Sequence, residues 1–168
     1  YLPAQLFAKA EEGVFTYTMP LTKDTNNVRV VLQQLSGEAM ARDRFTFRIT
    51  AENGRMDWNN ELLSDEPITY YAWHQQSGTA DMPGTITSLS AVVAELTTAR
   101  LTVRDRTRAA GDDFPDERRM YLTVSDNDTQ RVVARVPLVD YALMVKGENR
   151  RDMDDQEFLD RMDEYNLV

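Results

Sequence analysis

Short runs in which apolar and polar residues alternate, separated by turn-forming residues, limit what this chain can fold into more than any other feature of its sequence. In the clearest run, RFTFRITAENG, polar residues separate Phe45, Phe47 and Ile49. A period of two places successive side chains on opposite faces, so each run predicts a β-strand with one buried face. We expect seven strands, over residues 14–20, 26–37, 44–54, 68–73, 91–103, 119–126 and 131–138.

This series of short strands predicts an all-β protein, a two-sheet antiparallel sandwich with Greek-key connections. The stretches 52–67 and 74–87 contain prolines and glycines and are expected to be loops, the first with an optional helical turn over WNNELL. Asn53-Gly54 is expected to form a turn, because these residue types tolerate positive φ. Asn127-Asp128 is expected to occupy the tip of a hairpin between the last two strands. The 168 residues suit one domain.

The segment MDDQEFLDRMDEY, residues 153–165, departs from the strand period. Phe158, Leu159, Met162 and Tyr165 lie at helical spacing and predict a short amphipathic helix whose apolar face caps the core. Asp154, three residues before Glu157, predicts an N-cap, and acidic residues in the first turn suit the helix dipole. Asp160 and Arg161 are adjacent and cannot face each other on a helix, so we expect each to bind a neighbouring loop or strand.

Composition argues against several classes of protein. The net charge is -9, and the arginine-rich stretch 100–119 also carries five acidic residues, so we interpret it as a mixed-charge loop rather than a nucleic-acid surface. The chain has no cysteine, which excludes disulfides and thiolate metal sites within it. It shows neither an apolar run of membrane-spanning length nor a signal-peptide pattern.

Candidate chemistry is sparse, and we expect no catalytic, cofactor or metal site and no enzyme activity. The one histidine, His74, has Ser77 nearby but no further partner that would indicate a nucleophilic triad. The acidic stretches 126–128 and 152–157 lack the glycine that a calcium loop of the EF-hand type needs at its sixth position. Paired-acid glycan cleavage stays open, because carboxylates are abundant.

Four aromatic residues offer an alternative function, binding of carbohydrate at the cell surface. Trp58 and Trp73, with Tyr70 and Tyr71, could line a cleft on which sugar rings stack. The interpretation that we favour instead places Tyr71 and Trp73 in the sandwich core and Tyr70 outside it.

The C-terminal residues resemble a known family. VPLVDYALMVKGENRRDMDDQEFLDRMDEYNLV, residues 136–168, is similar to the C-terminal segment of FimB-type fimbrial anchor or accessory subunits of Bacteroidales, of the fimbrillin superfamily. The likeness covers roughly residues 14–168. The matching residues are Pro137, Leu138, Asp140, Tyr141, Asp155, Gln156, Glu157, Leu159, Asp160, Arg161, Asp163, Glu164 and Tyr165, with Phe158 and Met162 replacing the usual Tyr and Gln.

The resemblance implies a transthyretin-like sandwich in a lipoprotein attached to the outer membrane, on the outer face of a Gram-negative bacterium. Its expected role is to anchor or regulate a fimbrium and so to serve cell adhesion, with other fimbrial subunits as partners. The family's lipid-bearing cysteine has no counterpart in these 168 residues. We expect an N-terminal segment or linker over 1–13, a sandwich over 14–150, and over 151–168 a helix and the beginning of a further strand of a longer chain.

A further strand matters because a sandwich that lacks one exposes a sheet edge and an apolar groove, which a partner's strand can fill. The same polypeptide could instead supply that strand, which is the option that we favour, and the sequence leaves both options open. The function we expect is a structural one, fimbrial assembly by β-strand complementation. Surface carbohydrate binding by Trp58 and Trp73 is the alternative.

Overall fold

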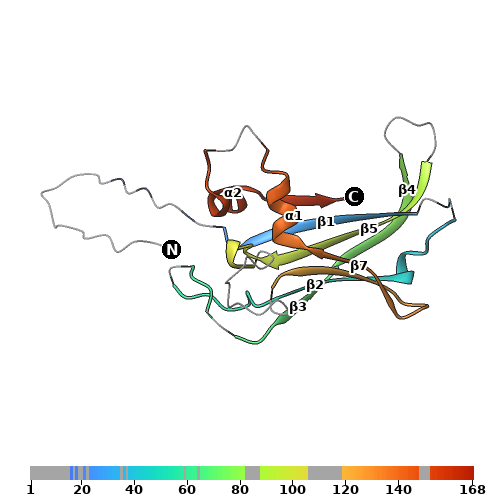
Figure 1. The fold of residues 1–168 in the computed structure, drawn as a ribbon, viewed down its shortest axis with the longest axis horizontal. Coiled ribbons are helices and arrows are strands. Elements are labelled where there is room, and N and C mark those ends of the chain that lie inside the picture. Colours follow the sequence, from blue (N-terminus) through green and yellow to red (C-terminus); the bar gives the residue numbers. More distant parts are fainter. Residues whose placement is uncertain are drawn as a thin grey trace, which may run out of the picture.

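The structure of the chain is a computed structural model that describes residues 16, 18, 21, 23–34, 36, 38–58, 60–63, 65–81, 88–105, 119–147 and 152–168. Within these residues, two four-stranded sheets face each other, as the all-β prediction requires (Figure 1). The strands alternate in burial as their sequences do; in β2, for example, Phe45, Phe47 and Ile49 point inward and are at most 7% exposed. The predicted antiparallel sandwich is thereby confirmed.

Sheet A has the strand order β4-β5-β1-β8. It consists of β4 (His74–Asp81), β5 (Ser88–Ala99), β1 (Thr25–Gln34) and β8 (Glu164–Leu167). The β4–β5 and β5–β1 pairs are antiparallel, whereas β8 runs parallel to β1 and covers only its Asn27–Val30 half. A parallel neighbour requires a crossover, and the chain reaches β8 from the opposite sheet.

Sheet B has the order β3-β2-β6-β7, and all its pairs are antiparallel. It consists of β3 (Ile68–Tyr71), β2 (Phe45–Ala51), β6 (Tyr121–Asp126) and β7 (Arg131–Pro137), and short 3-10 turns lie at Arg42–Arg44 and Val103–Asp105. A turn over residues 127–130 joins β6 to β7, as the sequence predicts. The chain passes from sheet B to sheet A between β3 and β4, through Ala72 and Trp73.

Two short helices carry the chain from β7 in sheet B to β8 in sheet A. Helix α1 (Leu138–Met144) directly follows β7, and α2 (Asp155–Arg161) directly precedes β8. They lie side by side along one side of the sandwich (Figure 1). Leu138, Val139 and Ala142 of α1 are fully buried and join the same core as the sheets, so the two helices close this side. No helix among the described residues is long and apolar enough to cross a membrane.

Several boundaries differ from the prediction. Residues 74–81, expected to be a loop, form β4; β5 covers 88–99 rather than 91–103; and residues 138–144, where a strand was to end, form α1. The described part of the 52–67 loop contains no helix but an isolated bridge between Met56 and Leu62. The strand expected over 14–20 and the linker expected over 1–13 fall almost entirely outside the described residues.

The predicted placement of the aromatic residues is wrong. Tyr71 is 61% and Trp73 67% exposed, whereas Tyr70 packs against the core. The phase of β3 is set by its neighbour in the sheet: Tyr70 lies opposite the fully buried Ile49, and cross-strand partners share a face.

Asn53 does not form the expected turn with Gly54, since neither residue has the positive φ for which these residue types were noted. It is buried, where its amide donates to Ala99 O and accepts from the Tyr70 hydroxyl at 2.8 Å, and so links the two sheets.

Candidate functional site

Helix α2 contains most of the C-terminal signature, defined as residues 155–165. Its N-cap is Asp154, whose carboxylate accepts from the backbone N–H of Glu157 at 2.8 Å. The apolar side of the helix places Phe158 and Leu159 in the core, at 0% and 1% exposure. Met162 follows the helix and is partly buried. Tyr165 was expected on the same helical face, but it lies in β8.

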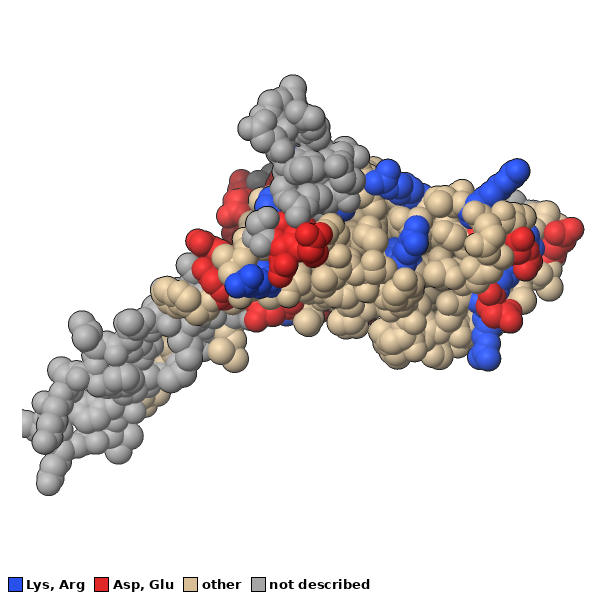
Figure 2. Space-filling view, turned by 90° about the horizontal axis from the view of Figure 1, so that it is seen from below, with Lys and Arg blue, Asp and Glu red and all other residues tan. Residues whose placement is uncertain are grey.

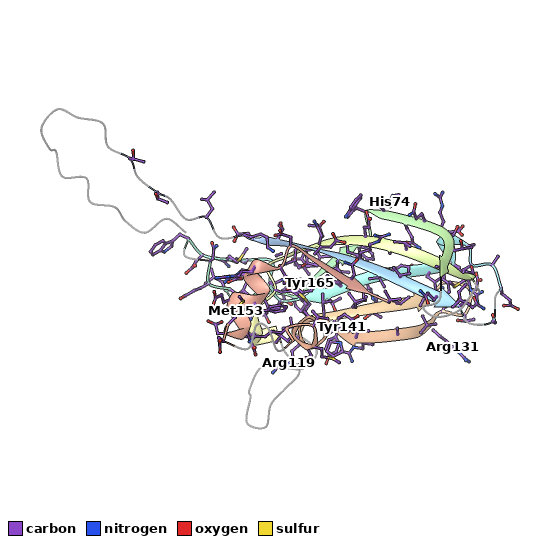
Figure 3. The ribbon with its side chains drawn as sticks, turned by 90° about the horizontal axis from the view of Figure 1, so that it is seen from above. His74, Arg119, Arg131, Tyr141, Met153 and Tyr165 are labelled. Atoms are coloured by element: carbon purple, nitrogen blue, oxygen red, sulfur yellow. The ribbon has the colours of Figure 1, made fainter. Side chains whose placement is uncertain are left out.

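Tyr165 is buried all the same, because β8 alternates and directs Tyr165 and Leu167 inward. Its hydroxyl donates to Leu159 O at 3.4 Å, so the strand and the helix are in direct contact. Burial raises the pKa of the Tyr165 hydroxyl, with a smaller contribution from the nearby Asp160 carboxylate. Tyr165 and Tyr141, which donates to Asn166 O from α1, both lie along the closed side of the sandwich (Figure 3).

Asp160 binds a residue distant in the sequence, as expected. Its two carboxylate oxygens accept from Arg100 Nε at 2.7 Å and Arg100 Nη2 at 2.6 Å, a bidentate pair just beyond the end of β5. The hydrogen bond to Asp160 raises the pKa of Arg100, against the opposing effect of burial. Gln156 adds a second connection, because its amide donates to Leu101 O and accepts from the N–H of Val103.

Arg161 does not behave as expected. It pairs with Glu157 within the same helix, one turn earlier, rather than with a neighbouring loop or strand. Asp155 pairs with Lys146, which follows α1, at 2.9 Å. The signature residues thus hold α2 against β5 and α1, and none of these contacts forms a site for chemistry.

The start of β8 is fixed to β1 by polar contacts. The Asn26 amide donates to Met162 O at 2.8 Å and accepts from the N–H of Leu101 at 3.1 Å. Lys23 bonds Met162 O and pairs with Asp163 at 3.1 Å. These contacts set the register in which β8 joins β1.

The other candidate residues do not come together. His74 and Ser77 both lie on β4, but strand residues three apart point to opposite faces. No group of three metal-ligating side chains occurs among the described residues. In the 126–128 stretch, Asp126 caps its own turn: it accepts from the backbone N–H groups of Asp128 and Thr129 and pairs with Arg44.

Where the structure describes the arginine-rich stretch, its arginines stabilise the fold. Arg104 donates to Glu52 O at 2.5 Å, and the fully buried Arg119 donates to Arg104 O at 2.9 Å. Viewed from the side of sheet B, the acidic and basic side chains of the described residues are interspersed and form no extended patch of one sign (Figure 2). Residues 106–118 lie outside the described residues, so the interpretation of the stretch as a mixed-charge loop stays a prediction.

The four edge strands differ in how well they are protected against pairing, and residues 31–34 of β1, beyond the end of β8, have no described strand on that side. Edge strand β7 carries Arg131, Arg135 and Pro137 and pairs with β6 through a register shift, all of which discourage a further strand. Strands β3 and β8 are only four residues long, and the β8 backbone already accepts from Tyr141.

Strand β4 is the exception. It has eight residues, pairs with β5 in continuous register, contains no proline, lysine or arginine, and no described strand covers its outer edge. Among the described strands, β4 therefore presents the edge best suited to accept another strand.

Trp58 and Trp73 are both exposed, at 74% and 67%, but they occupy separate places. Trp73, between β3 and β4, lines a hollow of about 170 Å³ on sheet A, together with Asn27, Val28, Arg29, Glu95, Leu96 and Glu164. Trp58 lies in the 52–67 segment and lines neither this hollow nor its neighbour on the same sheet. Sequence reasoning found Trp73 but not the residues around it, because three other strands supply them.

Comparison with solved structures identifies similar folds in proteins from Bacteroides and Porphyromonas. A proposed adhesin from Bacteroides thetaiotaomicron is 36% identical with a TM-score of 0.71, and the match covers 86% of this chain and 45% of that one. A proposed adhesin from Bacteroides ovatus is 27% identical with a TM-score of 0.64, over 90% of this chain and 44% of that one. The fimbrial anchor protein Mfa2 from Porphyromonas gingivalis, 15% identical with a TM-score of 0.50 over 85% of this chain and 38% of that one, shares the fold.

The chain spans less than half the length of each of these structures. No curated protein sequence matches it. A family model does: the model of the fimbrillin-A associated anchor proteins Mfa1 and Mfa2 matches residues 5–168, nearly the entire sequence. This match and the 36% identity over 86% of the chain agree with the resemblance of the C-terminal residues. The chain belongs to the Mfa2 family of fimbrillin-A associated anchor proteins.

Proposed function

We propose that the chain is a structural module of an anchor or accessory subunit of fimbriae, on the surface of a bacterium of the Bacteroidales, and that it has no catalytic activity. Its membership of the fimbrial anchor family supports this role. The similarity to proposed adhesins from two Bacteroides species points the same way. In this proposal the module follows a transthyretin-like plan, and its partners are other fimbrial subunits.

The observation that carries the mechanism is the unprotected edge of β4. A strand from a neighbouring subunit would pair with this edge, with main-chain hydrogen bonds providing affinity and alternate side chains providing register. The eight residues of β4 offer a longer edge than the four residues of β3 or β8. The charges and the proline of β7 favour β4 over the remaining edge.

The proposal places the subunit at the outer membrane by means of a lipid. The lipid is carried outside these 168 residues, since they contain no cysteine to bear it. Closure of the sandwich by α1, α2 and β8 gives the module a stable body that can transmit force between the lipid anchor and the fimbrial shaft.

Copurification tests the proposal. Epitope-tagged protein, expressed in its own bacterium, is expected to bring down fimbrial shaft or accessory subunits that mass spectrometry can identify. Gly78→Pro in β4 is designed to block strand addition, and Gly78→Ala is the matched control, because a Cβ at Gly78 would meet no atom within 4 Å.

Successive residues of a strand direct their backbone N–H groups to opposite edges, so Ser77→Pro is made alongside Gly78→Pro. One of the two prolines removes an N–H at the outer edge of β4 and leaves the hydrogen bonds between β4 and β5 intact. The folded proline variant, identified by an unchanged melting temperature, should lose the fimbrial partner while Gly78→Ala retains it. Copurification that survives in that folded variant would exclude the β4 edge, and failure to recover any fimbrial subunit with the unmodified protein would refute the fimbrial role.

A further inference from the structure

The outer face of sheet A carries a row of polar side chains. The register of the sheet places His74, Glu95, Arg29 and Asn166 next to one another across β4, β5, β1 and β8. These side chains point outward, because their neighbours along each strand, such as Val28 and Leu96, are buried. In Figure 3, His74 marks the β4 edge of this sheet, across from the side where Tyr141 lies. The hollow beside Trp73 lies on this face.

Charged side chains in the hollow have no partner among the described residues. Arg29 and Glu95 are directly opposite each other on β1 and β5, yet within the described residues neither side chain, nor that of Glu164, makes a hydrogen bond or an ion pair. Asn27 accepts from the Thr97 hydroxyl at 3.0 Å, which leaves its amide N–H groups available. The hollow therefore presents donors from Arg29 and Asn27 and acceptors from the two glutamates.

An aromatic surface stands beside these polar groups. Trp73 is 67% exposed, and its ring lies tilted against His74 with 5.8 Å between the ring centroids. No described hydrogen bond involves the indole N–H. An exposed tryptophan next to unpaired polar groups suits a ligand in which each ring has an apolar face and polar groups at its rim.

The hollow continues along the sheet. A second hollow of about 290 Å³ shares Arg29 and extends over Val31, Gln76, Gly78 and Val93. Gly78 leaves open space where a side chain would stand. The first hollow falls short of the roughly 300 Å³ that encloses a drug-sized molecule. The two hollows together suit an extended ligand lying across the strands better than a small enclosed one.

We propose that this face binds a neutral oligosaccharide chain. A pyranose ring has an apolar C–H face that packs on an indole, and hydroxyl groups at its rim that donate to carboxylates and accept from guanidinium and amide groups. Trp73 provides the stacking surface, Glu95 and Glu164 accept, and Arg29 and Asn27 donate. The hollow contains two carboxylates and one guanidinium, and the chain has a net charge of -9, so an acidic sugar would be repelled.

The test uses the intact chain and a panel of neutral hexasaccharides of glucose, mannose, galactose and N-acetylglucosamine, with hexagalacturonate as the acidic comparator. Isothermal titration calorimetry should show saturable binding of at least one neutral member and not of hexagalacturonate. Trp73→Ala should weaken that binding at least about tenfold, since stacking on an exposed aromatic ring contributes on this scale. Glu95→Gln, which keeps the shape of the side chain, should weaken it by a smaller factor.

Trp58→Ala is the matched control, because Trp58 is the other exposed tryptophan and lies outside both hollows. It should bind as the unmodified chain does. The proposal is overturned if no neutral hexasaccharide binds, if hexagalacturonate binds more tightly, or if Trp58→Ala abolishes binding while Trp73→Ala does not. Loss of fimbrial copurification in Trp73→Ala without any glycan binding would instead make this face a protein interface. The binding assay does not involve other fimbrial subunits, so its failure would leave the fimbrial role intact.

Discussion

The bidentate pair between Arg100 and Asp160 offers the sharpest test of how α2 is held. Asp160→Asn keeps the shape of the side chain but removes its charge, so the Arg100 guanidinium loses its ionic partner. The Asn side chain keeps one oxygen that can accept from Arg100, whose Nη1 also donates to Asn60 O at 3.1 Å.

The expected magnitude follows from burial. The Arg100 and Asp160 side chains are 15% and 25% exposed, so the pair is intermediate in burial. Its contribution to stability should therefore lie between that of exposed pairs, about 0 to 1 kcal/mol, and the cost of disrupting buried pairs, about 3 to 5 kcal/mol. We therefore expect Asp160→Asn to lower the free energy of unfolding by about 2 kcal/mol. For a chain of this size that corresponds to a fall in melting temperature of about 4 to 8 °C.

Urea unfolding followed by tryptophan fluorescence and circular dichroism measures the change. A double-mutant cycle with Arg100→Met should give a coupling energy of about 1.5 to 3 kcal/mol. Glu157→Gln is the control: it disrupts the exposed Glu157–Arg161 pair on the same helix and should cost no more than about 0.5 kcal/mol. A coupling energy no larger than the effect of this control would show that the Arg100–Asp160 pair does not anchor α2.

Three further predictions concern the same segment and the β6–β7 turn. Leu159→Asp should destabilise the domain by more than about 4 kcal/mol, because it buries a carboxylate at a 1% exposed position, and an unchanged melting temperature would mean that α2 is not docked. Asp154→Ala removes the N-cap and should cost about 1 kcal/mol in urea unfolding, whereas Asp154→Ser should restore most of it. The backbone N–H of Thr129, and then Arg44, hold the pKa of Asp126 below its ordinary value. The resulting stabilisation is complete above the unfolded-state pKa of about 4 and is lost as the pH falls through the lower folded-state pKa. Asp126→Asn should therefore flatten the acid side of the curve of melting temperature against pH. An unaltered slope would contradict this reasoning.

Strand alternation made the sandwich predictable because β1, β2 and β5 are buried on one face along most of their length. Strand β4 went unrecognised for the opposite reason. Its sequence, HQQSGTAD, carries no apolar alternation, because β4 is an edge strand whose side chains from Gln76 to Thr79 are exposed. Only pairing with β5 makes these residues a strand, and pairing partners are not visible in a local pattern.

The C-terminal segment shows how two periods can be confused. Tyr165 is seven residues from Phe158 and so fits a helical face, but it also alternates with Leu167 as a strand requires. The helix in fact ends at Arg161, and Tyr165 is buried from β8. Four residues of strand are too few for a period of two to outweigh a helical pattern that precedes them.

The exposed position of Trp73 could not have been predicted from its own neighbourhood. In YYAW, alternation alone permits either phase, and we expected Tyr71 and Trp73 rather than Tyr70 to be buried. The phase is decided by β2, where Ile49 draws its partner Tyr70 inward. The polar groups beside Trp73 come from strands far apart in the sequence, so only the sheet registers bring them together.

The C-terminal signature and the order of the strands are physically linked. Strand β8 lies parallel to β1, so the chain cannot reach it from β7 by a hairpin and must cross from one sheet to the other. Helices α1 and α2 make that crossing and at the same time bury apolar residues along the open side of the sandwich. The chain enters β8 at a fixed position only if α2 is held in place. Asp160 holds it by accepting from Arg100, and Gln156 by donating to Leu101 O. The route of the chain thus explains the role of Asp160 in the signature, and it leaves the β4 edge and the outer face of sheet A for the partners that we propose.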